Sequence, residues 1–189
     1  MTKRPAPKNL LQLRIELRHT NPLVWRTVVV PDTITLVKLH AVIQAAMGWY
    51  GGHLHEFEIA GQRYGMIDPE WDTDPELIDE SRKRLLKVLG AHRHFDYLYD
   101  FGDAWWHWVT LQARMPMTKP QHYAFCVAGE NACPPEDVGG LPGYYEFIEA
   151  VTNRNHEEHE AMIEWCGGTF DLSRFDIDST NTRLKQVKL

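Results

Sequence analysis

Long apolar runs are missing from this chain of 189 residues. No stretch approaches the length of about 18 apolar residues that a membrane-spanning helix needs, and the first ten residues lack the apolar core of a signal peptide. Cysteine is scarce too, and Cys126, Cys133 and Cys166 cannot form a closed set of disulfide bonds. We therefore expect a cytoplasmic protein with reduced thiols and no membrane partner.

Complete catalytic signatures are missing as well. The chain has no phosphate-binding loop, no dinucleotide-binding fingerprint and no G-x-S-x-G elbow. The "DFG" of residues 100–102 also occurs in kinases, but the Gly-rich loop, the "VAIK" strand and the "HRD" loop of a kinase do not accompany it. The sequence therefore excludes the enzyme classes that these motifs define.

Positive charge is scarce in the body of the chain. Six of the 20 basic residues lie in the first eight or the last seven positions, Arg183 among them. The body keeps 14 basic against 26 acidic residues, a net charge of about −12. Because phosphate backbones require a basic surface, extensive nucleic-acid binding is not expected. The basic ends are expected to be solvated tails, with residues 1–9 forming a flexible arm.

Aromatic residues are plentiful, with seven Trp, seven Tyr and seven Phe, enough for a sizeable core and a lined groove. Residues 10–18 alternate apolar and polar side chains, and a second β-rich run at 24–30 follows the turn at Asn21-Pro22. The runs "HFDYLY" and "WHWVTLQ" flank "DFGD" in the same way. These runs and the turns between them predict two β-hairpins.

Helices are predicted between and after the hairpins. Apolar residues recur at helical spacing from Leu36 to Met47, with Thr35 as N-cap and Gly48 just past the end. A strand and turn at 55–65, an acidic insertion at 68–80 and a short helix at 83–90 follow. The last third is predicted to be helical, with a helix start at Asn155 and Glu158. We therefore expect an α+β fold with one domain at 10–189. Its mixed or antiparallel sheet consists of two hairpin units with a β-grasp-like first half, and its helices are peripheral.

Three stretches rich in Asp, Glu, His and Gly lie where predicted strands end. In the first, "HLHEF", His53 and His55 would share one face of a strand. They could bind one metal ion, or they could be satisfied histidines at the edge of a core that continues into Phe57.

The second stretch, "DFGDAWWHW", places Asp100, Asp103 and His107 within eight residues. Carboxylates and an imidazole around a tight turn could hold a divalent ion. Turns also favour Asp and Gly for their own backbone hydrogen bonds, so a structural role stays open.

The third stretch is "CPPEDVGG", residues 133–140. Its prolines stiffen the loop and its glycines allow unusual backbone conformations, so we expect a fixed shape. Glu136 and Asp137 need a positive neighbour because like charges repel, and Arg26, a histidine or a bound cation could supply it. Cys126 and Cys133 are only weak metal candidates, since structural zinc needs two close pairs of ligands.

Strand ends can gather side chains from separate segments into one pocket. We therefore expect loop 133–140 to pack against the turn at 100–103, with "HLHE" close by, in one polar cleft. The candidate cleft residues are Arg26, His53, His55, Asp100, Asp103, His107, Glu136 and Asp137.

Five stretches together resemble one known family. They are "NPLVWRTVVVP", "TLVKLHAVIQAAMGWYGGHLHEFEIAGQRYG", "YLYDFGDAWWHWV", "CVAGENACPPEDVGGLPGYYEFIEAV", and "HEEHEAMIEW" with "FDLSRFD". The chain is similar, from about Leu11 to Leu184, to the plasmid open-reading-frame-three-like family. That family was first noted on a root-inducing plasmid, and its members are often labelled transposon-passenger TnpR-like proteins.

The resemblance implies one α+β domain with a mixed sheet and peripheral helices, and it implies no assigned activity. Some members carry a further Cys where this chain has Val138, which argues against a Cys-rich metal site. Resolvase activity is not expected, because only three serines are present and no helix-turn-helix signature follows them. The motif residues that the resemblance implies are Trp25, Arg26, His40, Trp49, His53, His55, Phe57, Asp100, Gly102, Asp103, His107, Cys126, Cys133, Pro134, Pro135, Glu136, Asp137, Gly139, Gly140 and Trp165.

Two functions remain open from the sequence. The first is a non-catalytic interaction module, linked to mobile elements, that binds an unknown protein or small ligand without a cofactor. The acidic body, the aromatic surplus and the lack of a complete catalytic set favour it. The alternative is a metal-dependent hydrolase that uses a divalent ion and the His, Asp and Glu residues of the expected cleft.

Overall fold

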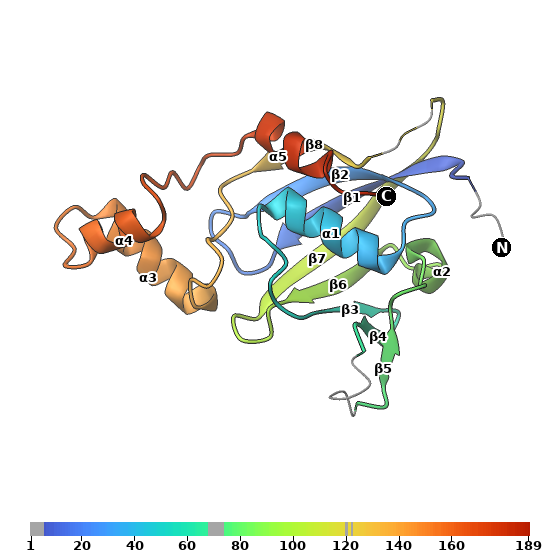
Figure 1. The fold of residues 1–189 in the computed structure, drawn as a ribbon, viewed down its shortest axis with the longest axis horizontal. Helices are drawn as coiled ribbons and strands as arrows, with labels where there is room; N and C mark the ends of the chain where they lie inside the picture. The colour runs from blue at the N-terminus through green and yellow to red at the C-terminus, as the bar shows by residue number, and fades with distance from the viewer. Residues whose placement is uncertain (1–5, 68–73, 120, 122) are drawn as a thin grey trace.

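The computed structural model describes residues 6–67, 74–119, 121 and 123–189. Within these residues, one eight-stranded sheet and five helices form a single domain (Figure 1). Parts of the basic arm expected at 1–9 and of the acidic insertion expected at 68–80 lie outside the described residues. Strand β1 begins at Asn9, and the arm itself stays a prediction.

The sheet is mixed, with strand order β5-β4-β3-β6-β7-β1-β2-β8. All neighbouring strands are antiparallel except β4 and β5, which are parallel. The strands are β1 (Asn9–Leu17), β2 (Trp25–Pro31), β3 (His55–Ile59), β4 (Gln62–Gly65), β5 (Leu77–Asp79), β6 (His94–Tyr99), β7 (Trp105–Pro116) and β8 (Phe125–Glu130).

The predicted α+β class and both predicted hairpins, β1–β2 and β6–β7, are confirmed. The β-grasp-like first half is not confirmed, because β3 pairs with β6 while β1 lies between β2 and β7. The expectation that the last third is helical needs a correction at β8. This strand pairs with the edge of β2. Its register shifts between Thr27 and Val28, and this irregularity interrupts the apolar and polar alternation by which a strand is predicted.

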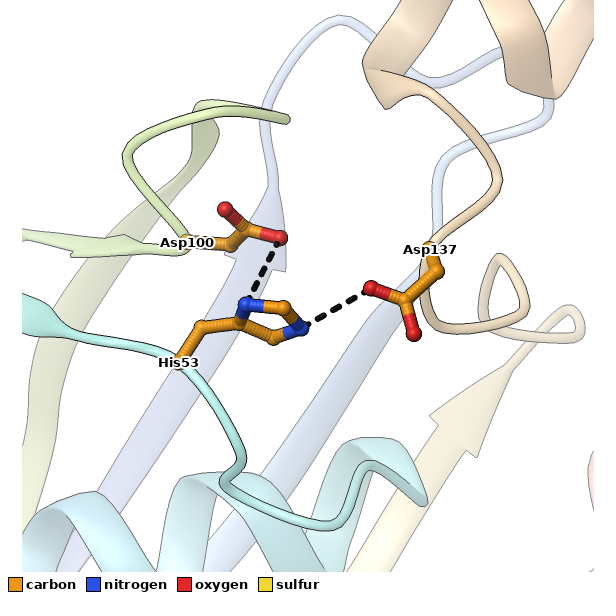
Figure 2. A group of neighbouring side chains, drawn as sticks. All are labelled: His53, Asp100 and Asp137. Carbon is orange, nitrogen blue, oxygen red and sulfur yellow. Dashed lines mark ion pairs between the residues drawn. The ribbon is translucent and has the colours of Figure 1, made fainter.

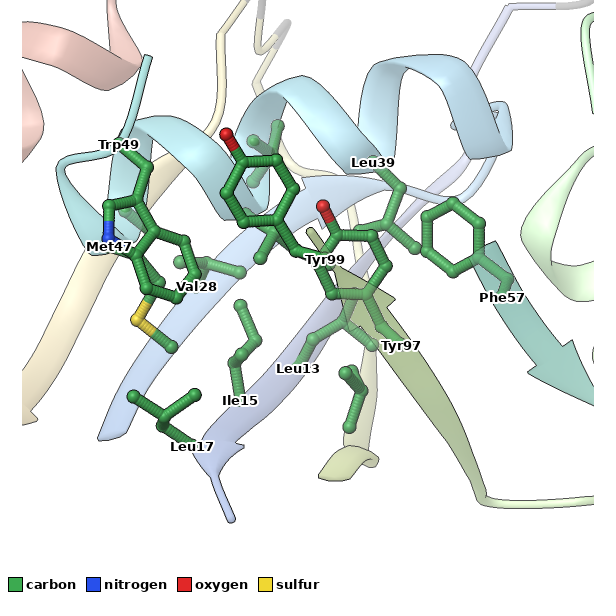
Figure 3. Packing of buried hydrophobic residues seen from close by; sticks show 14 of the residues in the cluster. Leu13, Ile15, Leu17, Val28, Leu39, Met47, Trp49, Phe57, Tyr97 and Tyr99 are labelled. Atoms are coloured by element: carbon green, nitrogen blue, oxygen red, sulfur yellow. The ribbon is translucent and has the colours of Figure 1, made fainter. Parts of the chain in front are cut away.

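Helix α1 (Leu36–Met47) packs on one face of the sheet, and its apolar side chains meet those of the strands (Figure 3). Leu36, Leu39, Ile43 and Met47 are all buried, as their helical spacing predicts. The helix ends where predicted, because Gly48 adopts a left-handed conformation with φ of 99° and donates its N–H to Gln44 O.

The remaining helices are α2 (Leu85–Leu89), α3 (Gly140–Thr152), α4 (His159–Trp165) and α5 (Ile177–Leu184). Helices α3 and α4 pack on each other at one end of the molecule, while α5 lies against α1 and β8 (Figure 1). The predicted start at Asn155 is wrong by a few residues, because Asn155 N binds Asn153 Oδ1 in a turn and α4 begins after Glu158. Within the described residues, no helix is long and apolar enough to cross a membrane.

Candidate functional site

Trp49 joins the end of α1 to the loop of residues 133–140, called the acidic loop below. Its indole Nε1 donates to the carbonyl oxygen of Pro134 at 3.0 Å. Its ring stacks on Tyr99, with centroids 5.1 Å apart, and meets His107 edge-on. Because Trp49 is buried and hydrogen-bonded, it fixes the acidic loop over the end of the sheet.

Glu136 is bound from two sides. Its Oε2 accepts the backbone N–H of Tyr50 at 2.8 Å, and its Oε1 accepts the hydroxyl of Tyr99. Burial, together with this bond to a carboxylate, raises the pKa of Tyr99 well above its usual value. Glu136 therefore binds the acidic loop to the segment after α1 and to β6, and neither of these contacts involves Arg26.

The acidic loop packs against the turn of residues 100–103, as the sequence predicts. Gly139 N donates to Asp103 Oδ2 at 3.2 Å. At Gly140, with φ of 67°, an added Cβ would lie only 2.6 Å from the backbone oxygen of Asp103. The turn is held from within, because Asp100 Oδ1 accepts the N–H of Gly102 at 2.9 Å. The contact between loop and turn is therefore too close for a side chain at position 140.

His53, Asp100 and Asp137 come together from three segments at this contact (Figure 2). His53 Nε2 lies 2.9 Å from Asp137 Oδ1, and its Nδ1 lies 3.6 Å from Asp100 Oδ2. The exposed side-chain fraction rises from 11% for Asp100 through 35% for His53 to 69% for Asp137, so the group opens to solvent at Asp137. Of the three neighbours that the sequence proposes for the acidic loop, a histidine, His53, is thus the one that lies against Asp137.

These three side chains could also hold a cation. One ligand atom from each lies within 4.8 Å of the others. Among the described residues, these three form the group of His, Cys, Asp or Glu side chains that could hold a metal ion. Imidazole nitrogen and carboxylate oxygen suit zinc or manganese, and three protein ligands would leave positions open for water or substrate. Asp103 and Glu136 lie next to the group, but their oxygens accept other hydrogen bonds.

His55 does not join His53. It begins β3, its ring stacks on His40 with centroids 3.6 Å apart, and its Nε2 lies 3.0 Å from Glu80 Oε1 inside the protein. Burial and the neighbouring His55 lower the pKa of His40 to about 3. The expected shared strand face is wrong because His53 precedes the strand, so the alternation does not apply to it.

His107 does not line the cleft either. It points inward from β7, is fully buried, and faces the carbonyl oxygens of Trp105 (2.9 Å) and Tyr97 (3.3 Å) through Nδ1. Its Nε2 is buried without a hydrogen-bond partner among the described residues. Burial lowers the pKa of His107 to about 4, so the ring is neutral at physiological pH.

Arg26 is buried in a different role from the one expected. It donates to four backbone carbonyl oxygens, those of Trp25 (2.7 Å), Glu130 (2.7 Å), Asn131 (2.8 Å) and Ala46 (3.3 Å). Its guanidinium also lies 4.3 Å from the ring centre of Phe175. Arg26 therefore joins β2, α1 and the segment after β8, and it forms no ion pair with Glu136 or Asp137 among the described residues.

The two weak metal candidates are protonated thiols. Cys126 Sγ donates to Ala128 O at 3.2 Å. Burial raises the pKa of Cys126, and it raises that of Cys133 to about 12. Within the described residues neither thiol belongs to a group of three possible metal ligands.

A pocket of about 830 Å³ lies beside the acidic loop. Its walls come from the end of α1, the acidic loop and the segment from Trp165 to Arg183. His53 and Asp137 line it, and so do two exposed rings, Tyr50 (91% exposed) and Trp165 (48% exposed).

Sequence reasoning missed most of this pocket. It treated Arg183 as part of a solvated tail, but Arg183 belongs to α5 and its Nε donates to Ala45 O at 2.9 Å. The sequence signal that could have predicted α5 was Asp176, a residue type that is favoured at the start of a helix. There the carboxylate caps α5 by accepting the N–H of Ser179 at 2.9 Å. Tyr50, Arg174 and Phe175 also line the pocket. They lie within the stretches that resemble the family, but no chemical pattern set them apart as site residues.

Comparisons with known proteins agree with this architecture. An uncharacterized protein of Sinorhizobium fredii, y4hQ, is 41% identical over 182 residues, which cover 95% of this chain and 89% of y4hQ. The crystal structure of a protein of unknown function, MM3350 from Methanosarcina mazei, superposes with a TM-score of 0.82 at 32% identity. That superposition covers 92% of this chain and 98% of the other. The sequence pattern of the family described as "plasmid pRiA4b ORF-3-like protein" matches residues 9–179. The chain therefore belongs to the plasmid pRiA4b ORF-3-like family.

Proposed function

We propose that this protein is a non-catalytic binding module whose pocket beside the acidic loop accepts a small organic ligand. The pocket itself carries the proposal. Its volume of about 830 Å³ falls within the range of roughly 300–1,000 Å³ that is typical of small-molecule sites.

The exposed rings at the pocket support a binding role. Tyr50 and Trp165 leave large apolar surfaces in water. A ligand that covers such a ring is stabilised in proportion to the apolar area removed from water. Stacking on the ring adds a preference for flat groups. A flat organic ligand is therefore the chemistry that this wall favours.

The fixed shape of the pocket also supports binding. The bonds from Trp49 to Pro134 and from Tyr50 to Glu136 hold one wall in place before any ligand arrives. A preorganised wall lowers the entropic cost of binding. Cys133, the thiol on this wall, has a pKa raised by burial to about 12, so it is a poor nucleophile at neutral pH.

A fragment screen tests the proposed function. Hits from a thermal-shift screen would be measured by calorimetry against the wild type and Tyr50→Ala, which removes the exposed ring. We expect flat fragments to bind, and Tyr50→Ala to weaken them about tenfold. Tyr123→Ala, which removes an exposed ring outside the pocket, is the matched control and should change nothing. The proposal fails if no fragment binds, or if Tyr50→Ala leaves every affinity unchanged.

The group of His53, Asp100 and Asp137 favours a second candidate, a metal-dependent hydrolase. A divalent ion held by these three ligands at the pocket could activate a water molecule for attack on a bound substrate. Elemental analysis of protein purified without a His-tag tests it. One equivalent of zinc or manganese that is lost in Asp137→Asn, but kept in Asp171→Asn, would favour the enzyme. Asp171 is a suitable control because it lines the same pocket outside the group.

We further propose that the protein is associated with a mobile genetic element, as the TnpR-like label suggests, and that it acts in the cytoplasm. The plasmid name of the family supports this proposal. Fractionation of cells that express the tagged protein from its own gene would test the compartment. Recovery in the membrane or secreted fraction would contradict it.

A further inference from the structure

Two arginines beside each other line the pocket without a carboxylate partner. Arg26 and Arg183 both belong to its wall. Among the described residues, no ion pair includes either of them. The two guanidinium groups donate to adjacent carbonyl oxygens at the end of α1, Arg26 to that of Ala46 and Arg183 to that of Ala45. Two full positive charges therefore lie together at this wall.

The hydrogen bonds of the two guanidinium groups leave donors free. A guanidinium has five N–H groups. Arg26 uses four of them on backbone carbonyls. Arg183 uses three, on Ala45 O (2.9 Å), Ser179 Oγ (3.1 Å) and Thr180 Oγ1 (3.1 Å). Within the described residues, one donor of Arg26 and two of Arg183 thus remain for a bound group.

The end of α1 compensates only part of this charge. Arg183 donates to Ala45 O and Arg26 donates to Ala46 O, which are among the last carbonyls of the helix. The carboxyl end of a helix carries about half of one negative charge. The end of α1 therefore offsets less than one of the two positive charges.

The acids of the pocket are committed elsewhere. Glu136 accepts the N–H of Tyr50, and Asp137 contacts the ring of His53. Asp171 accepts the hydroxyl of Ser173, and Asp176 accepts the N–H of Ser179. They add negative charge to the pocket, and none of them lies within ion-pair distance of Arg26 or Arg183.

We infer that the pocket binds a small organic anion, whose carboxylate or phosphate group contacts Arg183 and Arg26 and whose flat apolar body stacks on the aromatic wall. The two remaining N–H groups of Arg183 can donate to the oxygens of either anionic group. Phe175 covers Arg26 and lines the same pocket, so the anionic group and the flat body would find their contacts side by side. This inference rests on the proposed function and specifies its ligand class.

Calorimetry with three probes tests the inference: 2-naphthoate, 2-naphthyl phosphate and the uncharged 2-naphthamide. We expect at least one anion to bind, the amide to bind at least tenfold more weakly than naphthoate, and the tighter anion to identify the head group. Arg183→Gln should weaken the anions roughly ten- to a hundredfold, and Arg183→Lys less, because it keeps the charge. Arg93→Gln is the matched control, since Arg93 also donates to backbone carbonyls but lies outside the pocket.

A second measurement covers the case in which Arg183→Gln does not fold, as judged by circular dichroism. Raising the salt concentration should weaken the anions bound to the wild type and leave the amide unaffected. The inference is overturned if amide and naphthoate bind equally, if folded Arg183→Gln keeps its affinity, or if neither anion binds. In these cases a pocket that still binds uncharged fragments would preserve the proposed function, whereas a pocket that binds nothing would end both.

Discussion

His107 is a histidine that the fold keeps neutral. It is fully buried, and burial lowers its pKa from 6.5 to about 4. The His107 imidazole is therefore protonated near pH 6.5 in the unfolded chain but only near pH 4 in the folded protein. Stability from this residue is complete above pH 6.5 and is lost as the pH falls below it. The expected loss between pH 7 and pH 5 is about 2 kcal/mol.

Urea unfolding at pH 7 and pH 5 measures this loss. His107→Leu removes the titrating group from the core. The variant should show a fall in unfolding free energy between the two pH values that is smaller than the wild-type fall by about 2 kcal/mol. The exposed His92, changed to Gln, is the control and should keep the wild-type pH dependence. Equal pH dependence in His107→Leu and the wild type would contradict a neutral buried imidazole.

Single residues also show where sequence reasoning ends. The sequence identified His53, Asp100 and Asp137 as candidates, because Asp, His and Gly at strand ends stand out from an apolar pattern. It could not separate them from His55 and His107, since the direction of a side chain depends on where a strand begins. Strand β3 begins at His55, and this single boundary sends His53 to the pocket and His55 to Glu80.

At the scale of elements, the contact between the acidic loop and the turn at 100–103 depends on Gly140. An alanine there would need a positive φ, and its Cβ would meet Asp103 O at 2.6 Å. We expect Gly140→Ala to lower the free energy of unfolding by about 2–4 kcal/mol, the sum of backbone strain and overpacking. Thermal and urea unfolding measure this loss.

Gly167 provides the control for backbone strain alone. Its φ is 78°, and an added Cβ there would meet nothing within 4 Å. Gly167→Ala should therefore cost only about 1–2 kcal/mol. Equal losses of stability in the two variants would contradict a close contact between the loop and the turn at position 140.

Elements with a regular pattern were predictable, and those held by distant contacts were not. Strand β1 alternates apolar and polar residues, β2 is a run rich in β-branched residues, and α1 has apolar residues at helical spacing between Thr35 and Gly48. The local sequence therefore determines these elements. Strand β8 has no such pattern, because its place depends on the edge of β2 and on Asn181, which exchanges hydrogen bonds with the backbone of Cys126. The pocket was hidden for the same reason, since its walls meet only in the folded chain.

At the scale of the whole molecule, the charge of −6 opposes duplex DNA binding. We expect fluorescence anisotropy to detect no saturable binding of a labelled duplex below about 10 μM protein at physiological salt. We also expect neither strand cleavage nor a covalent adduct when the purified protein is incubated with DNA. Cleavage or an adduct would show that the chain does act as a resolvase.

The central claim is that the pocket beside the acidic loop binds a small organic ligand, and a nitrogen–proton correlation spectrum of labelled protein tests it most directly. Titration with the tightest fragment should move the backbone signals of Gly48, Gly52, Cys133, Trp165 and Arg183, which all line the pocket. The signals of Met117 and Lys119, which line a separate surface pocket, should stay in place. Shifts confined to that second pocket, or no shifts at any concentration, would contradict the account.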